Sequence, residues 1–492
     1  MNIGRSRASL ALLLACLFPA ELRAVESKAA AAATRPNVVL ILADDLGIGD
    51  PGCYNPESKI PTPKIDALAA EGLRFDDAHS PAAVCTPTRY GLLTGRYSFR
   101  SRLKRGVLWG DDRLLIEAGR ETIASMLARE GYATALIGKW HLGLGAYDPE
   151  QPEEKTEYNG PFDAGPRTVG FEHFFGIPAT LDIPPYVYVE DDRVVQAATE
   201  WTPGSQHRWV GGDGFWRSGP IAPDFSHQQV LSDLTRRAVS YIERQAAGDS
   251  EKPFFLLFSL TAPHTPWVPK EDALGRSEAG DYGDLVVEID DSVGAVLEAL
   301  ERTGLSDETL CIFTSDNGSH WRPEDVKQFG HDAHLGYRGM KGDIHEAGHR
   351  IPLVVRWPGR VEPGKTTDAL VGLNDLYRTL ADVVGHAPEP GAAPDSISFL
   401  PVLSGKEGER TDLILHSFDG MYALRMGSWK LIAGLGSGGF TPPVRVRPAP
   451  GGPPGQLYDL SSDRAERDNL YLERPKLVKR LLRLLVQHLE QE

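Results

Sequence analysis

Four short apolar runs, each followed directly by polar residues, are the clearest pattern along the chain. They read NVVLILADD, YATALIGKWH, PFFLLFSLTAPH and ETLCIFTSDNG, beginning at residues 37, 132, 253 and 308. Such continuous runs, rich in β-branched and aromatic residues, are typical of strands buried on both faces of a sheet. Segments with helical periodicity lie between them, at 121–131, 232–245 and 282–304. This alternation predicts an α/β fold with a mostly parallel sheet sandwiched by helices.

The last hundred residues show a different pattern. Residues 386–396 (HAPEPGAAPDS) predict a linker or a long surface connection. Short apolar runs then predict a small antiparallel sheet, an amphipathic helix at 474–491 closes the chain, and the Gly- and Pro-rich residues 435–455 predict an irregular loop. We therefore expect a main domain at 36–385 and a smaller C-terminal α+β subdomain at 395–492.

The first 24 residues have the features of a secretory signal peptide. Arg5 and Arg7 precede an apolar run that ends near Leu17, and small residues follow. The run is too short for a mature membrane anchor, and no later stretch is long and apolar enough to span a bilayer. We expect an exported protein, periplasmic or extracellular, cleaved between Ala20 and the Ala-rich segment at 27–34. The Leu-Leu-Ala-Cys at 13–16 weakly resembles a lipoprotein cleavage box, so lipid anchoring is an alternative.

Composition and charge narrow the function classes. The 492 residues are 41% hydrophobic and 24% charged, as in ordinary globular proteins, and the formal net charge of −16 argues against a general nucleic-acid binder. Removal of the leader leaves Cys53, Cys85 and Cys311. An odd number in an oxidising compartment means that one thiol is unpaired or chemically altered. Cys53 and Cys311 are one possible pair, which the sequence leaves open.

The polar residues that follow the four runs are expected to lie together. In open α/β sheets, ligands bind outside the carboxyl ends of the strands. At two of these ends the chain carries oxygen ligands: Asp44, Asp45, Asp316 and Asn317. Carboxylates held close together repel one another unless a divalent cation lies between them, and oxygen-only ligation favours Ca²⁺ or Mg²⁺ over zinc. Either motif alone fits a loop cap or turn, but their coincidence favours a metal site.

Cations and acid–base groups accompany these carboxylates. Lys139, His141 and His264 follow buried runs directly, although a single histidine is more often a surface or core residue than a catalyst. Cys85 opens a helix-like run behind a proline-bearing turn, and Arg89 follows four residues later. Helix N-termini and guanidinium groups both stabilise negative charge, so this environment suits a reactive cysteine better than a structural one.

Several of these segments resemble the sulfatase family. AVCTPTRYGLLTG, built on Cys-x-Pro-x-Arg, and GYATALIGKWH resemble its two signatures. ADDLGIGD, TAPHTP, SDNG and MKGDIHEAGHRIPLVVRWPG are similar to its other blocks, in the same order, so that the resemblance runs from about residue 37 to 360. The chain is identified as similar to type I, formylglycine-dependent sulfatases, among them arylsulfatases and bacterial carbohydrate sulfatases of the N-acetylgalactosamine-6-sulfatase type, with an alkaline-phosphatase-like α/β fold.

This resemblance implies a covalent mechanism centred on residue 85. In the family this cysteine is oxidised to Cα-formylglycine by a dedicated maturation enzyme. One hydroxyl of the hydrated aldehyde attacks the sulfur of a sulfate ester, and the other lets the hemiacetal collapse and expel sulfate. The implied ligands of a Ca²⁺ ion, with Mg²⁺ less favoured, are the formylglycine at 85 together with Asp44, Asp45, Asp316 and Asn317.

The resemblance also implies a role for each remaining group. Arg89 holds the nucleophile and the carboxylates in place, and Asp316 also accepts the nucleophile's proton. Sulfate oxygens are bound by Lys139 and Lys341. His264 protonates the leaving alcohol, and His141 is the base for sulfate release. Thr180, in FFGIPATLD, stands where many relatives have a sulfate-binding serine, and is a candidate substrate contact.

The family acts on aryl sulfates, sulfated sugars, glycosaminoglycan ends and sterol sulfates. GIPATLDIPPYVYVEDD and DIHEAGHRIP resemble blocks of bacterial members that act on sulfated carbohydrates, which favours a carbohydrate sulfate, with small aryl sulfates also accepted. Four tryptophans are candidates for stacking on a sugar or for core packing, and one or two of four histidines near Lys341 are candidates to line the pocket: Trp109, Trp216, Trp267 and Trp321, and His331, His334, His345 and His349.

Two alternative functions are considered. A phosphonate or phosphate ester hydrolase on the same scaffold would use overlapping catalytic groups. A catalytically silent sugar-binding homologue would retain an unconverted Cys85. The oligomeric state is left open.

Overall fold

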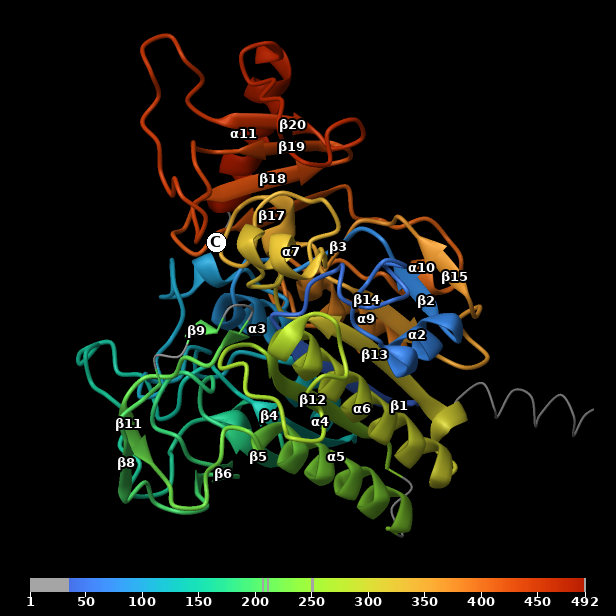
Figure 1. Cartoon of the computed structure of the whole chain (residues 1–492). Helices are drawn as coiled ribbons and strands as arrows, with labels where there is room; N and C mark the ends of the chain where they lie inside the picture. Colours follow the sequence, from blue (N-terminus) through green and yellow to red (C-terminus); the bar gives the residue numbers. More distant parts are fainter. Residues whose placement is uncertain (1–34, 206–207, 210–211, 249–251, 491–492) are drawn as a thin grey trace, which may run out of the picture. The chain divides into compact units, whose positions relative to one another are not determined.

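The four apolar runs form adjacent strands at the centre of a large sheet (Figure 1). Their order across the sheet is β13-β1-β12-β4, and all three contacts between them are parallel. Every residue of the first three is buried, so helices and loops cover both faces of the sheet. The predicted mostly parallel α/β sheet is confirmed by these strands: β1 (Asn37–Asp44), β4 (Ala133–Lys139), β12 (Phe254–Pro263) and β13 (Thr309–Ser315).

Shorter strands extend the sheet on both sides, and here the pairing becomes mixed. β14 (Leu353–Arg356) is antiparallel to both β13 and β2 (Leu73–Phe75), and on the other side β6 is antiparallel to β5. The remaining strands at these margins are β5 (His173–Ile177), β6 (Val189–Glu190), β7 (Arg193–Val194) and β15 (Lys365–Thr367). The described part of the chain thus contains a ten-stranded, mostly parallel sheet.

Helices form where the sequence shows 3.6-residue periodicity. α5 (Val230–Ala247) and α6 (Gly280–Arg302) pack side by side against β12, as Figure 1 shows in green and yellow. A second group, α3, α4 and α9, is held together by mutual contacts. The other helices of the main part are α2 (Pro63–Ala70), α3 (Cys85–Thr94), α4 (Ile123–Arg129), α7 (Pro323–Phe329), α8 (Glu346–His349), α9 (Leu376–Val384) and α10 (Leu400–Leu403).

Short elements complete the main part of the chain. They are β3 (Ala78–His79), β8 (Glu200–Thr202), β9 (Arg208–Trp209), β10 (Gly212–Asp213), β11 (Gly219–Ile221) and β16 (Val371–Gly372), with 3-10 turns η1 (Ser98–Arg100), η2 (Pro166–Val169), η3 (Ser306–Glu308) and η4 (Leu373–Asp375).

The C-terminal residues form the small antiparallel sheet and terminal helix that the sequence predicts. The strands pair in chain order, and α11 (Pro475–Glu490) packs on β18 and β19 through Val478, Leu481 and Leu485. Residues 386–396 and 435–455 contain no helix and no strand. The four strands are β17 (Asp412–His416), β18 (Tyr422–Met426), β19 (Trp429–Ile432) and β20 (Gln456–Asp459).

A buried cation joins this small sheet to the main part of the chain. The ammonium group of Lys430, on β19, lies 3.1 Å from Glu346 of α8, 3.0 Å from His349 and 3.0 Å from Glu466. All four side chains are buried. Removing one partner would leave an uncompensated charge inside the protein, so β19 and α8 are fixed to one another.

The computed structural model describes residues 35–205, 208–209, 212–248 and 252–490, and Asn37–Glu492 form one unit. The expected signal peptide at 1–24 lies outside the described residues. Among the helices that are described, none is long and apolar enough to cross a membrane.

One glycine shapes the end of β4, where the polar residues begin. Gly138 has a φ of 129°, and a Cβ atom there would lie 1.7 Å from the carbonyl oxygen of Ser259 on β12. His141, three residues on, also has a positive φ, 56°. The chain therefore turns sharply after the strand, which carries Lys139 and His141 over the carboxyl edge of the sheet.

Replacing this glycine should destabilise the protein. Gly138→Ala forces the two strands apart, and we expect a loss of roughly 4 kcal/mol or more, seen as a large fall in the thermal unfolding midpoint. Gly131→Ala is the matched control, because Gly131 also has a positive φ (89°) but has open space around its Cβ position. That change should cost only about 1–2 kcal/mol. Similar midpoints for the two variants would contradict the close approach of the strands.

Candidate active site

Three buried carboxylates meet at the carboxyl edge of the central strands. Asp44 ends β1, Asp45 follows it, and Asp316 follows β13; one oxygen of each lies within 4.8 Å of the others. The backbone N–H of Asp45 donates to Asp316 Oδ1 at 3.2 Å, and the Asn317 amide donates to Asp45 Oδ1 at 2.7 Å. The structure thus brings together the four oxygen-bearing residues that the sequence singled out.

Each carboxylate has its own cation. Lys139 Nζ lies 2.7 Å from Asp44 Oδ2, and Lys341 Nζ lies 2.7 Å from Asp45 Oδ2. Burial alone would raise the pKa of Asp44, but Lys139 and His264 outweigh it and hold the pKa below its usual value. The pKa of Asp45 is lowered in the same way, with Lys341 as the main cation opposing burial. Both groups are therefore carboxylates at neutral pH.

Arg89 ties three strands to the helix that carries Cys85. Its Nε and Nη2 atoms donate to Asp316 Oδ2 at 2.9 and 2.7 Å. Its Nη1 atom donates to the hydroxyl of Ser259 at 2.6 Å and to the carbonyl of Lys139 at 3.0 Å. Such a fork of charge-assisted bonds fixes both position and orientation. Ser259 was not predicted from the sequence, because it lies inside an apolar strand with no motif around it.

Cys85 is the first residue of α3 and is 2% exposed. Its sulfur, a carboxylate oxygen of Asp44 and a ring nitrogen of His264 all lie within 4.8 Å of one another. Residue 85 is therefore next to both the carboxylate cluster and a titratable histidine. Cys53 and Cys311 are free cysteines as well, so the pairing between them that the sequence left open is not made.

His264 follows β12 and has one nitrogen directed at the carboxylates. Its Nδ1 lies 2.7 Å from the carbonyl oxygen of Thr265 and 3.1 Å from the hydroxyl of Thr180, and its Nε2 lies 3.9 Å from Asp45 Oδ2. Burial and Lys341 favour the neutral ring, but Asp45 and Asp44 raise the pKa of His264 to about 9. The ring is thus suited to donate a proton. Thr180, which the sequence suggested as a substrate contact, lies against this ring.

His141 is suited to the opposite role. Its Nε2 lies 2.9 Å from the carbonyl oxygen of Leu108, which can only accept, so this nitrogen carries the proton of the neutral ring. Burial and the nearby Lys139 hold the pKa of His141 well below its usual value. Its Nδ1 is buried and has no hydrogen-bond partner among the described residues. A neutral ring with a free Nδ1 lone pair is a proton acceptor.

The donor set fits a divalent cation. Asp44 Oδ1 and Asn317 Oδ1 are buried and have no hydrogen-bond partner in the described part of the chain. Buried oxygens without partners are rare in native proteins and call for an ion, a water or a ligand. Two such oxygens beside three carboxylates make the set of hard ligands that Ca²⁺ prefers.

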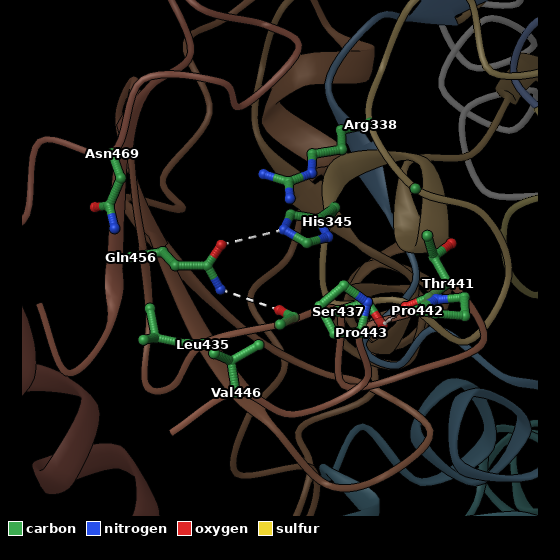
Figure 2. Close-up of a pocket in the computed structure, with 12 residues that line it drawn as sticks. Arg338, His345, Leu435, Ser437, Thr441, Pro442, Pro443, Val446, Gln456 and Asn469 are labelled. Atoms are coloured by element: carbon green, nitrogen blue, oxygen red, sulfur yellow. Dashed lines mark hydrogen bonds between the residues drawn. The ribbon is translucent and has the colours of Figure 1, made fainter. Parts of the chain in front are cut away.

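The four histidines near Lys341 have other partners. His331 Nε2 lies 2.8 Å from Asp50 Oδ1, His334 Nε2 lies 3.4 Å from the carbonyl oxygen of Ser319, and His349 packs between His79 and Lys430. His345 lines a separate cavity of about 300 Å³, where it faces Gln456 (Figure 2). In the described structure, none of the four has a hydrogen bond or ion pair with Asp44, Asp45 or Asp316. His320, which the sequence did not single out, is influenced by the charge of Lys341. Burial and Lys341 lower the pKa of His320 to about 3.

The four tryptophans are also separated by the structure. Trp267 and Trp321 are buried and pack on Tyr282, and Trp216 stacks on His227. Trp109 is 50% exposed. Trp109 is therefore the one of these four that presents a large open face.

The fold and these groups define a class: an α/β protein with a cluster of buried carboxylates, cations and histidines at the carboxyl edge of its sheet. Residues 36–386 match the family model described as Sulfatase, so the chain belongs to the sulfatase family and is a sulfuric ester hydrolase.

Named relatives agree with this assignment. The chain is 33% identical over 486 residues to an N-acetylgalactosamine-6-O-sulfatase of Bacteroides thetaiotaomicron, covering 92% of each protein. It is 33% identical to human arylsulfatase A, covering 89% of this chain and 84% of that protein. A solved structure from a study of glycosaminoglycan metabolism by Bacteroides thetaiotaomicron matches with a TM-score of 0.81 and 32% identity, covering 93% of this chain and all of that one. A phosphonate monoester hydrolase of Agrobacterium radiobacter, 20% identical with a TM-score of 0.58, shares the fold.

The fork made by Arg89 should be essential. Arg89→Lys keeps the charge but cannot reach Asp316, Ser259 and the Lys139 carbonyl together, so we expect hydrolysis of 4-nitrophenyl sulfate to fall about 100-fold or more. Arg96→Lys, two residues after the end of the same helix, is the control. Arg96 pairs with Glu117, whose side chain is 40% exposed, so its replacement should change the rate less than about threefold. Equal effects of the two changes would contradict a special role for the fork.

Proposed function

We propose that the enzyme hydrolyses sulfate monoesters of a sulfated carbohydrate, and also small aryl sulfates, through a formylglycine formed from Cys85 and a bound Ca²⁺ ion. The observation that carries this proposal is the meeting of Cys85, Asp44 and His264 within 4.8 Å, at the start of α3 and beside the carboxylate cluster. A thiol has no evident use at this place, whereas an aldehyde hydrate there would supply the hydroxyl that attacks sulfur.

The ion would be held by the residue at 85 together with Asp44, Asp45, Asp316 and Asn317. Calcium is favoured over magnesium because protein oxygens dominate this donor set, while Mg²⁺ usually keeps several waters. Bound there, the ion supplies positive charge that withdraws electron density from the sulfate oxygens.

The chain's own residues complete the chemistry. Lys139 and Lys341 place their ammonium groups beside the carboxylates, where they also bind sulfate oxygens and offset the charge that grows in the transition state. Asp316, held by Arg89, accepts the nucleophile's proton. His264 donates a proton to the leaving alcohol through Nε2, since its Nδ1 is engaged by the Thr265 carbonyl.

The second half of the reaction needs a base. His141 serves because it is buried, neutral and free at Nδ1, and it accepts the proton whose loss expels sulfate. Thr180 contributes by contact with His264 and, through its hydroxyl, with the sulfate group.

Burial also bears on maturation. Because Cys85 is 2% exposed and α3 is buried along its whole length, an oxidising maturation enzyme must reach it before folding is complete. This order fits a protein exported to the periplasm or beyond with a signal peptide at 1–24. We further propose that 36–385 is the catalytic domain and 395–492 a supporting subdomain.

The proposed nucleophile is tested by substitution of Cys85 and by mass spectrometry of the peptide that contains it. Cys85→Ala should abolish turnover of 4-nitrophenyl sulfate while the thermal unfolding midpoint stays within a few degrees, because alanine fits the same space. The peptide around residue 85 of the active enzyme should show an aldehyde in place of a thiol. Cys53→Ala, the control, should keep its activity. Turnover by the Cys85→Ala protein, or full activity with an unmodified thiol, would refute the nucleophile.

Metal removal should lower stability as well as activity. Stripping with a chelator such as EGTA uncovers mutual repulsion among three buried carboxylates, and readdition of Ca²⁺ at about 100 times its Kd should restore about 2.7 kcal/mol, read as a rise of the unfolding midpoint. In Asn317→Ala, which lacks one ligand oxygen, the Ca²⁺ concentration for half the rise should increase at least tenfold. If the unfolding midpoint changes neither with the chelator nor with Ca²⁺, the proposal that a Ca²⁺ ion binds at this site is wrong.

A further inference from the structure

A further buried carboxylate, Asp182, lies at the edge of the active site. Asp182 is 8% exposed, and its Oδ2 accepts a hydrogen bond from Arg217 Nη1 at 2.5 Å. Its Oδ1 is buried and has no hydrogen-bond partner among the described residues. Leaving a buried carboxylate oxygen unpaired is costly, so this oxygen is expected to meet a donor that is not part of the chain.

The chain places this carboxylate next to the proton donor. Asp182 lies in a turn closed by a hydrogen bond from the Ile183 N–H to the Thr180 carbonyl, and the Thr180 hydroxyl contacts His264. Burial would raise the pKa of Asp182, but His264, Arg217 and, more weakly, Lys341 outweigh it and lower the pKa. Asp182 is therefore an anion within electrostatic reach of two groups of the active site.

An exposed aromatic ring lies next to Arg217, which donates to this carboxylate. The guanidinium group of Arg217 lies 5.1 Å from the ring centroid of Trp109, which is 50% exposed. Trp109 directly follows Leu108, whose carbonyl oxygen contacts His141 Nε2. The loop is held in place, since a Cβ atom on Gly110 would lie only 2.2 Å from the carbonyl oxygen of Pro184.

The turn that carries Asp182 contacts His264, and Trp109 follows the residue that contacts His141. Because Arg217 contacts both Asp182 and Trp109, the three side chains extend from one histidine toward the other. Together they offer an apolar ring face, a hydrogen-bond acceptor and a charged hydrogen-bond donor. A pyranose ring matches all three, because its C–H face stacks on an aromatic ring while its hydroxyls both donate and accept. A phenol or a sterol alcohol has no further hydroxyl near the ester, and would leave Asp182 Oδ1 unpaired.

We propose that Asp182, Arg217 and Trp109 form the subsite for the alcohol part of the substrate, and that this alcohol is a pyranose with a free hydroxyl that donates to Asp182. This inference rests on the proposed sulfatase activity of the same site. It adds the source of selectivity: a site built to pair a hydroxyl rejects ligands that lack it far more strongly than an apolar pocket rejects a change of shape.

The test compares two substrates in three variants. For Asp182→Asn, the ratio of kcat/KM on N-acetylgalactosamine 6-sulfate to kcat/KM on 4-nitrophenyl sulfate should fall at least 30-fold, because only the sugar uses Asp182. For Trp109→Ala, we expect a fall of at least fivefold in the same ratio. Trp201→Ala, which removes a tryptophan that is 69% exposed on β8, is the control and should leave both rates within twofold. Other monosulfated hexoses are run in parallel to cover the sulfate position.

A binding measurement separates this proposal from the sulfatase proposal. Calorimetric titration with unsulfated N-acetylgalactosamine and galactose should show binding to the unaltered protein that Asp182→Asn weakens at least tenfold. If the enzyme cleaves the aryl sulfate but neither cleaves nor binds any sugar, the subsite is wrong and the sulfatase activity stands. If sugar binds through Asp182 but no sulfate ester is cleaved, the subsite stands and the proposed sulfatase activity is wrong. Equal losses on both substrates, or none, would also overturn the subsite.

Discussion

Three carboxylates that share one buried edge of the sheet, each matched by its own cation, are the constraint on which the rest of the structure depends. Isolated in such a place, any one of them would be protonated or would destabilise the fold. Lys139 and Lys341 keep Asp44 and Asp45 charged, and Arg89 forms an ion pair with Asp316, so this edge of the sheet presents both hard oxygen donors and cations. The pairing explains why so many polar groups tolerate almost complete burial.

The same pairing sets the two histidines apart. His264 faces two carboxylates, which favour its protonated form, whereas burial and the neighbouring charges of Lys139 and Arg89 favour the neutral form of His141. One edge of one sheet thus holds an acid and a base at the same pH. The difference comes from neighbouring charges, since both rings are buried.

Much of the fold and of the candidate site could be predicted from the sequence, for physical reasons. The central strands are continuous apolar runs, and their polar ends had to meet once the strands were parallel neighbours. The margins were not accessible, because strands such as β6 and β14 are two to four residues long and carry no periodicity of their own. Asp182 and Arg217 were missed because they are 35 positions apart, and their contact exists only in the folded chain. The histidine-rich segment gave no reliable guide to the site, because His331, His345 and His349 form internal hydrogen bonds with Asp50, Gln456 and Lys430.

The buried ammonium group of Lys430 has a consequence for how such enzymes can be altered. It joins β19 to α8, and α8 begins five residues after Lys341, in the segment that carries this sulfate-binding candidate. The small sheet therefore helps to hold in place the segment of chain that carries Lys341. Exchanging the small sheet between homologues, or deleting it to obtain a smaller enzyme, would disturb this segment. The residues from Lys341 to His349 would therefore have to be exchanged together with the sheet.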